Sequence, residues 1–320
     1  MSDVFDAIRA ACAAVAERAR AVRIDDAALR ALAGRLREDP PPPPVWDARY
    51  HHVGTPASTL AFVVTWNAVN FGSGWFPVLR KDAGLSGALT VVSALKRRFD
   101  AEGPWSAAEL AHMHETVLAP VLGQDLAHPE VAELVALYAR ALRDLGALLL
   151  GRHGGRFEDL VAAAGGSAAR LVAALAEMPF YRDVARYGEL EVPLYKRAQI
   201  TAADLELAFE GRGPGAFSDG ERLTIFADNL VPHVLRCEGV LVYAPALADR
   251  IARGELLPSG APEETEIRAC GLHAVERIVA EIRAGGGEAT ARGLDYVLWN
   301  RGQSPAIKAH PRHRARSVYY

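Results

Sequence analysis

The sequence predicts a mainly α-helical protein, and three observations lead to that prediction. Apolar residues recur at three- and four-residue steps over long stretches, as they do on the buried face of a helix. Candidate strands are few, short and not separated by hairpin turns. Hydrophobic residues make up 50% and charged residues 23% of the 320 residues, a globular composition with enough apolar side chains for a large core.

The helices can be placed in order along the chain. An opening helix carries one apolar stripe, formed by Val4, Ile8, Cys12 and Val15. Ser-x-x-Glu patterns predict capped helix starts at Ser106 and Ser218. Two long helices are expected, from Pro129 to Gly151 and over residues 262–284, because their apolar positions recur up to a glycine.

The remaining organisation is simple. Three short apolar runs are the candidate strands, residues 60–64, 191–196 and 240–243. The run DPPPPP at 39–44 predicts a rigid extended connector, and no second compositional regime follows it. We therefore expect an N-terminal helical segment with its connector over residues 1–44 and one helical domain over residues 45–320, together forming one compact unit.

Charge and cysteine content exclude several classes of protein. With 36 Lys and Arg against 39 Asp and Glu, the net charge of −3 argues against non-specific coating of nucleic acid. The longest apolar runs are far shorter than the ~20 residues of a membrane span. The N-terminus, with Asp3 and Asp6, does not resemble a signal peptide, and the three cysteines are far apart. We expect a cytoplasmic protein with no membrane or stable nucleic-acid partner, and the oligomeric state stays open.

The helix predicted to begin at Ser218 contains the most informative acid. On this helix Asp228 would lie at the margin of the apolar face, and Pro232 would remove the hydrogen bond to the carbonyl of Asp228. The helix should then bend at an acid that lies against the core. Two interpretations stay open, an aspartate that caps a nearby group and a catalytic carboxylate.

A basic pair, Lys196 and Arg197, precedes another predicted helix start at Thr201, where Asp204 completes the capped pattern. The free amides of a helix N-terminus suit an anion, so a phosphate group would fit there. A solvated basic pair is the alternative interpretation.

Polar side chains also interrupt apolar runs. Asn67 and Asn70, next to Phe71, must find partners in the protein or in a ligand. His51 and His52 adjoin each other but lack a third ligand at metal spacing, so no metal site is expected.

The segment LDYVLWN at 294–300 places Asp295 and Trp299 four residues apart on one helical face. Tyr296 and Asn300 lie one step round the same helix. An acceptor carboxylate beside aromatic planes can bind and stack a purine-like base. A packed aromatic helix with a cap is the alternative. The basic C-terminus would be a solvated tail, although its two final tyrosines are expected to pack.

Several motifs in register resemble the queuosine salvage protein family, whose members are queuosine 5′-phosphate N-glycosylases. In chain order they are NFGSGWF (70–76), FYRDV (180–184), LYKRAQI (194–200), FAD (226–228), EIRACGLHAVE (266–276) and LDYVLW (294–299). The resemblance extends from about residue 45 to the end of the chain, and the first 40 residues carry no such motif.

The resemblance implies a mainly helical fold related to helix-hairpin-helix DNA glycosylases. It also implies hydrolysis of the bond that joins queuine to ribose 5-phosphate, with no cofactor. Asp228 would be the catalytic carboxylate, and Phe226 would contact the base. Asp295 and Tyr296, from the LDY motif, would also belong to the substrate site.

A histidine upstream of the NF motif would bind the base as well, and it falls at His51 or His52. The chain departs from the family pattern at two positions. Asn67 stands where relatives often have the aspartate of D-x-x-N-F, and Asn300 stands where they often have an acid. The second departure bears on substrate affinity more than on chemistry.

The chemistry of the bond explains the need for a carboxylate. Departure of an N-linked base builds positive charge on the sugar, which a carboxylate stabilises. Queuine lacks the purine N7, so more of this stabilisation falls on Asp228. Lys196 and Arg197 are the candidates for binding the 5′-phosphate or for positioning Asp228. The alternatives are a base-excision DNA glycosylase, which usually has a basic duplex-binding face, and a non-catalytic queuine- or nucleotide-binding protein.

Overall fold

The structure is a computed structural model that describes residues 3–39 and 44–320. Its contacts divide the chain into two units. The first comprises Met1–Pro44, Asp183–Lys196 and Glu221–Arg316, and the second comprises Val45–Arg182, Arg197–Gly220 and Ser317–Tyr320. Pro40–Pro43, the middle of the predicted connector, lie outside the described residues. A single domain over residues 45–320 stays a prediction.

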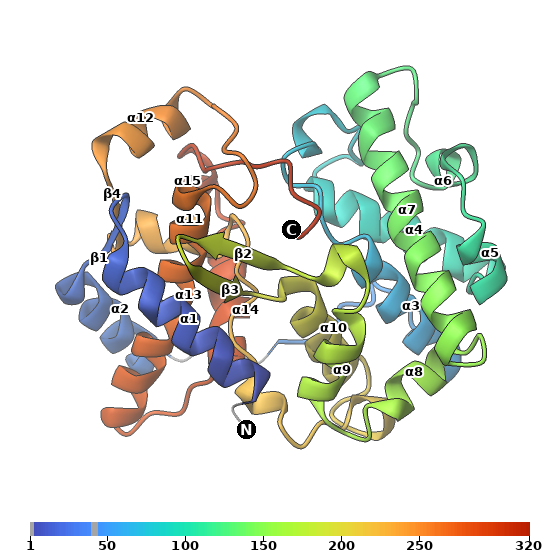
Figure 1. Ribbon diagram of the computed structural model, residues 1–320, viewed down its shortest axis with the longest axis horizontal. Coiled ribbons are helices and arrows are strands. Elements are labelled where there is room, and N and C mark those ends of the chain that lie inside the picture. Colours follow the sequence, from blue (N-terminus) through green and yellow to red (C-terminus); the bar gives the residue numbers. More distant parts are fainter. Residues whose placement is uncertain (1–2, 40–43) are drawn as a thin grey trace. The chain divides into compact units, whose positions relative to one another are not determined.

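The prediction of a mainly helical protein is confirmed (Figure 1). The strands of the described residues form only two sheets of two strands each. None of the helices described for residues 3–39 and 44–320 combines the length and the low charge that would let it cross a bilayer.

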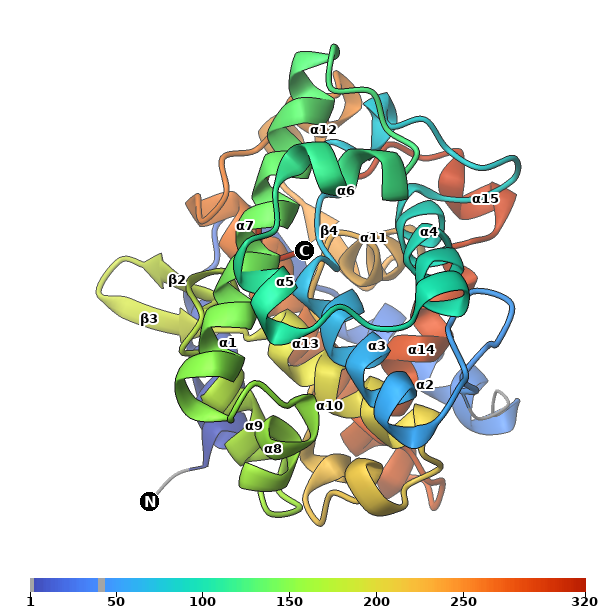
Figure 2. The same ribbon diagram turned by 90° about the vertical axis from the view of Figure 1, so that its right-hand side faces the viewer.

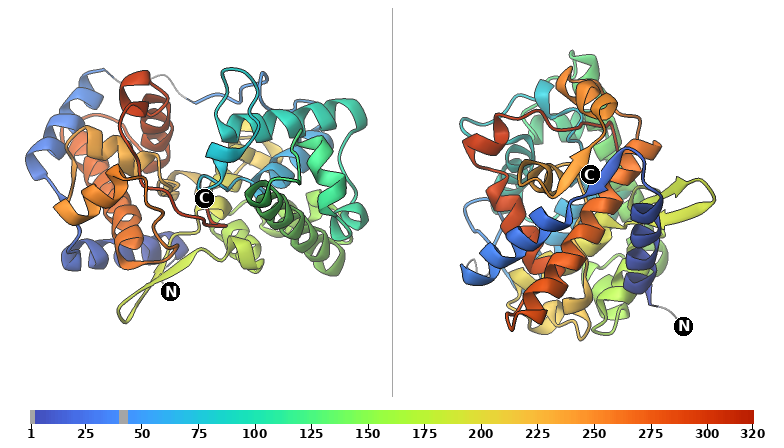
Figure 3. Two further views of the ribbon diagram at one scale, coloured as in Figure 1. Left: turned by 90° about the horizontal axis from the view of Figure 1, so that it is seen from above. Right: turned by 90° about the vertical axis from the view of Figure 1, so that its left-hand side faces the viewer.

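The first unit is built around one long helix, α13 (Pro262–Ala284), against which α1, α2 and α11 pack. Figure 3, right, shows α1 running alongside α13. The helices of this unit are α1 (Val4–Arg18), α2 (Asp26–Glu38), α11 (Val231–Cys237), α12 (Pro245–Ala252), α13, α14 (Ala291–Arg301) and α15 (Pro305–Lys308). Its antiparallel pairs are β1 (Val22–Ile24) with β4 (Leu241–Tyr243), and β2 (Val184–Tyr187) with β3 (Leu190–Pro193).

A buried carboxylate ties the N-terminal segment to α13. Glu266, 3% exposed, accepts hydrogen bonds at Oε2 from the amides of Arg20 (3.1 Å), Ala21 (2.6 Å) and Val22 (3.0 Å). Its other oxygen accepts from the Tyr187 hydroxyl at 2.8 Å. One acidic side chain of α13 thus holds the turn between α1 and β1 and also the β2–β3 hairpin.

In the second unit α3 and α7 pack against each other, and α4, α5, α6 and α8 pack against one or both of them (Figure 2). Gly146 of α7 allows the close approach of α5, because a Cβ at this position would lie 2.3 Å from the Ala111 amide nitrogen. The helices are α3 (Pro56–Ala68), α4 (Gly87–Glu102), α5 (Ala107–Ala111), α6 (Glu115–Val121), α7 (Pro129–Arg152), α8 (Phe157–Ala163), α9 (Ala168–Leu175) and α10 (Lys196–Ala208), whose first residue belongs to the other unit. Short 3₁₀ turns lie at Phe76–Val78, Pro179–Tyr181, Gly213–Gly215 and Gly220–Arg222.

Several element predictions are confirmed. The opening helix, the helix from Pro129 and the helix over residues 262–284 are present as α1, α7 and α13. The capping box at Ser106 is complete, because Ser106 and Glu109 each bond the other's backbone amide.

Other element predictions are wrong. Residues 60–64 belong to α3, which is buried on every side from Thr59 to Ala68, so its apolar run shows no helical period. No long helix begins at Ser218. Asp219 instead caps α9 by accepting from the amides of Ala168 (2.6 Å) and Ala169 (3.1 Å). The hairpin of β2 and β3 was also not predicted, and its turn contains Gly188 at φ +57°.

Candidate functional site

Asp228 lies on an irregular segment of the first unit, immediately before α11. Its Oδ1 accepts hydrogen bonds from the amides of Leu230 (2.7 Å) and Val231 (3.3 Å), so the half-buried carboxylate caps the helix. The predicted position at the margin of a long helix is wrong, and so is the predicted bend. Pro232 occupies the first turn of α11, where a proline costs no hydrogen bond. The interpretation of Asp228 as a capping residue is therefore confirmed. A catalytic role stays compatible with it, because Oδ2 has no hydrogen bond to the described residues.

Two side chains hold the residues before Asp228. The amide of Phe226 donates to Asp295 Oδ1 at 2.9 Å, and the carbonyl of Ala227 accepts from Arg268 Nε at 2.9 Å. A segment outside helices and strands must satisfy its peptide groups through such partners. The position of Asp228 is thus fixed from both sides along the chain.

Helix α14 brings its predicted residues to the same place. Asp295 is buried at 5% exposure, and the ring of Tyr296 meets that of Phe226 edge-on with centroids 6.1 Å apart. Asn300 is exposed on the last turn of this helix. The first unit therefore gathers Asp228, a second carboxylate and two aromatic rings.

A buried ion pair beside this cluster was not predicted from the sequence. The guanidinium of Arg268 donates to Asp183 through Nη1 (3.0 Å) and Nη2 (2.6 Å), and both side chains are almost fully buried. Both residues lie in motifs that resemble the family, FYRDV and EIRACGLHAVE. Arg268 could have been noticed because it is a charged residue on the apolar face of the helix predicted over residues 262–284, and a buried charge needs a partner.

The prediction for the basic pair is wrong in its helix start. Helix α10 begins at Lys196, and Thr201 lies inside it, where its hydroxyl donates to the Arg197 carbonyl at 2.7 Å. Neither side chain is solvated, because Lys196 is 6% and Arg197 1% exposed. The Lys196 amide donates to Asp183 Oδ2 at 3.1 Å, so the start of α10 meets the buried pair.

Arg197 belongs to the second unit, where its guanidinium binds backbone carbonyls. It donates to the carbonyls of Ala68 (2.6 Å), Asn67 (3.2 Å) and Phe180. The same group lies over the rings of Phe71 and Tyr181, at 4.7 and 4.5 Å from their centroids. These contacts give Arg197 a role in holding the loop after α3.

The two adjacent histidines differ in their surroundings. His52 is buried, with Nδ1 2.6 Å from Asp100 Oδ1 and Nε2 2.7 Å from Ser58 Oγ, so both ring nitrogens are occupied. His51 stacks on Trp46 at 4.1 Å between centroids, and its Nδ1 lies 3.0 Å from the Asp47 carbonyl.

The protonation state of His51 follows from this environment. Burial lowers the pKa of the His51 ring, against the smaller opposing effect of Asp47. A carbonyl accepts, so Nδ1 carries the proton and Nε2 of the neutral ring is an acceptor. Nε2 has no hydrogen bond to the described residues.

The buried amides find protein partners, as one of the two interpretations expected. Asn67 donates from Nδ2 to the Val63 carbonyl (3.1 Å) and to Asp204 Oδ2 (2.9 Å), and its Oδ1 accepts from Asn70 at 3.1 Å. An aspartate at position 67 would place a second carboxylate against Asp204. Asparagine at position 67, where relatives often have aspartate, instead donates a hydrogen bond to Asp204. Phe71 is buried beside it, with its ring 4.9 Å from that of Tyr138.

The C-terminal segment is packed, and it places a basic residue that was not predicted for the site, Arg312, near Asp228. Asn229 donates to the His313 carbonyl at 3.3 Å, directly after Asp228. Burial lowers the pKa of Arg312, while the nearby Asp228 carboxylate acts in the opposite direction. The final Tyr320 is 3% exposed and accepts at its carbonyl from the Gly72 amide at 3.0 Å, as expected for terminal aromatics.

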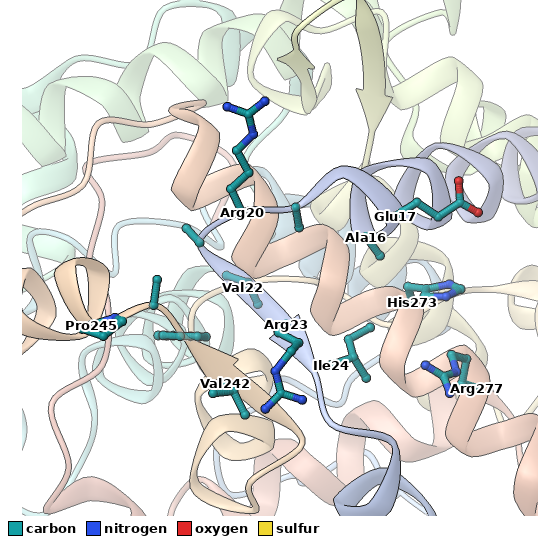
Figure 4. Close-up of a pocket in the computed structure, with 14 residues that line it drawn as sticks. Ala16, Glu17, Arg20, Val22, Arg23, Ile24, Val242, Pro245, His273 and Arg277 are labelled. Atoms are coloured by element: carbon teal, nitrogen blue, oxygen red, sulfur yellow. The ribbon is translucent and has the colours of Figure 1, made fainter.

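A cavity of about 630 Å³ in the first unit lies elsewhere, along β1, β4 and α13 (Figure 4). Its basic residues include Arg23 and Arg277, which pair with Asp25 (3.1 Å) and Asp26 (2.7 Å). None of the predicted site residues lines it. Among the described residues, no group of three or more His, Cys, Asp or Glu side chains could hold a metal ion.

The predicted site residues are therefore divided between the two units. The first unit holds Asp228, Phe226, Asp295, Tyr296, Asn300 and Lys196, and the second holds His51, His52, Asn70, Phe71 and Arg197. The class that the fold and site define is a mainly helical protein in which the segment of a held carboxylate, Asp228, is bonded to a second carboxylate, Asp295, near two aromatic rings.

Comparison with known proteins narrows this class. The sequence profile described as queuosine salvage protein matches residues 50–320. The chain is 37% identical to a Sphaerobacter thermophilus protein over 96% of its length and 95% of the relative's. It is 32% identical to a Bos taurus protein over 96% of both chains, and 37% identical to a Mus musculus protein over 57% of its length and 56% of the relative's. All three relatives are named queuosine 5′-phosphate N-glycosylase/hydrolase. The chain belongs to the queuosine salvage protein family.

Proposed function

We propose that this protein hydrolyses the N-glycosidic bond of queuosine 5′-monophosphate and releases queuine for salvage into tRNA modification, in the cytoplasm. The observation that carries the proposal is the held carboxylate of Asp228 in a chain that matches relatives of this name over nearly its whole length. The substrate is a small molecule, and no cofactor takes part in the proposed reaction.

Asp228 acts on the charge that develops on the ribose. Its Oδ1 is held by the amides of Leu230 and Val231 at the start of α11, so the carboxylate has a fixed orientation before substrate arrives. A preorganised negative group needs no reorganisation when positive charge appears at C1′, which is the main source of such stabilisation. The half-buried position excludes part of the water that would screen the interaction.

Asp295, Tyr296 and Phe226 bind the base. Asp295 accepts from the Phe226 amide at 2.9 Å, and a carboxylate is the acceptor that matches the N–H and amino donors of a guanine-type edge. The aromatic rings supply planar contact. Base recognition and the position of the catalytic segment are then coupled through one side chain.

Of the two histidines, His51 is the better candidate for the base. Both ring nitrogens of His52 have protein partners, whereas His51 presents a neutral Nε2 acceptor. The Arg197 guanidinium binds three backbone carbonyls of the second unit, so its charge serves the fold. We therefore propose Lys196, as the other member of the basic pair, for the 5′-phosphate.

The test is to incubate the protein with queuosine 5′-monophosphate, with queuosine and with damaged duplex DNA, and to measure free base by mass spectrometry. Release from the monophosphate, with much weaker release from the nucleoside, supports the proposal. Release from DNA would indicate a base-excision enzyme. Queuine binding without release from any of the three would indicate a carrier.

A further inference from the structure

The irregular segment at Asp228 depends on one buried side chain for the orientation of its peptide groups. Residues 226, 227 and 228 lie outside any helix or strand. The carbonyl of Ala227, which precedes the Asp228 amide in the same peptide plane, accepts from Arg268 Nε at 2.9 Å. Rotation about the Cα–C bond of Ala227 would turn this carbonyl and displace the Asp228 Cα, with its carboxylate, because the peptide unit is rigid.

Arg268 can fix that plane because it is itself fixed. Its Nη1 and Nη2 bind the two oxygens of Asp183, and Nη1 lies 3.6 Å from Glu264 one turn earlier on α13. The guanidinium is planar, so two bonds on one edge set the direction of the Nε–H on the other. Asp183 also holds the amide of Lys196, so the pair joins the Asp228 segment to the start of α10.

We infer that Arg268 is a positioning residue for Asp228, acting through the Ala227 carbonyl, and that Asp183 aligns Arg268 for this task. The inference rests on the proposed function where it concerns turnover. It goes beyond the stability of a buried ion pair, because a pair of charges alone needs no donor directed at residue 227.

Arg268→Lys separates the two roles. A lysine keeps the positive charge beside Asp183, yet it presents one ammonium group and cannot bind both Asp183 oxygens and the Ala227 carbonyl in a fixed geometry. We expect kcat for queuosine 5′-monophosphate to fall about 100-fold, the loss that a small misplacement of a catalytic group can cause, with KM within about threefold of wild type. Arg277→Lys, on the same helix in an exposed pair with Asp26, is the matched control and should leave both constants unchanged.

A second measurement needs no turnover. The amides of Leu230 and Val231 are bonded to Asp228 Oδ1, so their hydrogen exchange reports the position of this carboxylate. In Arg268→Lys the segment 223–231 should exchange about tenfold faster, while α1 and α2 keep wild-type protection. Wild-type exchange in this segment, or a wild-type kcat, would overturn the inference. Faster exchange throughout the first unit would also overturn it, since the pair would then serve stability alone.

Should Arg268→Lys fail to fold, Asp183→Asn gives the same two measurements, because an amide keeps one acceptor oxygen but cannot align the guanidinium from both. Unchanged exchange and kcat in this variant would contradict the inference. If wild-type protein releases no queuine, the proposed function fails, and the exchange measurement still decides the positioning role.

Discussion

At Asp228 one carboxylate oxygen serves the fold and the charge of the group serves the proposed chemistry, so the two roles can be separated by mutation. Asparagine keeps an oxygen that accepts from the Leu230 amide and removes the charge. We expect Asp228→Asn to lower queuine release by about 10²–10³-fold or more, with melting temperature and queuine affinity nearly unchanged. Single-turnover assays and calorimetry measure both.

The matched control is Asp249→Asn, because Asp249 is an exposed acid on α12 of the same unit. It should behave as wild type. An Asp228→Asn protein that kept a tenth of wild-type turnover would contradict the catalytic assignment.

Substitution of the two neighbouring histidines should affect different properties, ligand binding for His51 and stability for His52. His51→Ala should raise KM and weaken queuine binding, because the Nε2 acceptor is lost. His52→Ala should lower the free energy of unfolding by about 1–3 kcal/mol, because Asp100 and Ser58 lose their partner. Calorimetry and urea unfolding of both variants distinguish these outcomes, and the reverse pattern would place the base at His52.

At the scale of elements, α14 links base recognition to the catalytic segment. Asp295→Asn removes the charge and can turn an acceptor into a donor, which mismatches both the base edge and the Phe226 amide. We expect queuine affinity to fall at least about tenfold, equivalent to ~1.4 kcal/mol, measured by calorimetry. Asn67→Ala in α3 should have a milder effect on queuine binding. Unchanged affinity in Asp295→Asn would show that the base edge is bound elsewhere.

Elements could be predicted where periodicity and end signals coincide, as in α7 and α13 with their N-terminal prolines. The helix expected from Ser218 was wrong because residues 223–227 are all buried in an irregular segment. Apolar residues at helical spacing indicate that a segment is buried. They do not show whether its backbone forms the hydrogen bonds of a helix. Motifs pointed to Asp228 and Asp295, whereas the role of Arg268 depends on a bond to a distant carbonyl that only the folded chain forms.

For the whole molecule, buried and half-buried histidines should make stability depend on pH. Burial lowers the pKa of His51, His233 and His273, and it lowers that of His313 to about 3. Below pH about 6.5 these histidines become protonated in the unfolded chain but stay neutral in the folded protein until the pH reaches their lowered pKa. Stability should therefore fall as pH drops through this window, by up to about 1.4 kcal/mol per pH unit for each such ring.

Urea unfolding at a series of pH values measures this slope. His313→Gln should flatten it most, because His313 has the largest described shift among these rings. A free energy of unfolding that rises on acidification would contradict the assignment of neutral buried rings.

Glu266 shows that residues outside the family profile are part of the folded structure. The family profile begins at residue 50, yet this carboxylate binds three amides at residues 20–22. A fragment cut to the profile would leave a charge that is 3% exposed without those donors, and it would uncover the sides of α13 against which α1 and α2 pack. We expect such a fragment to aggregate on expression while the full chain folds. The start of the family profile and the start of the folding unit thus fall at different residues, and a truncated protein for expression should keep the N-terminal helices.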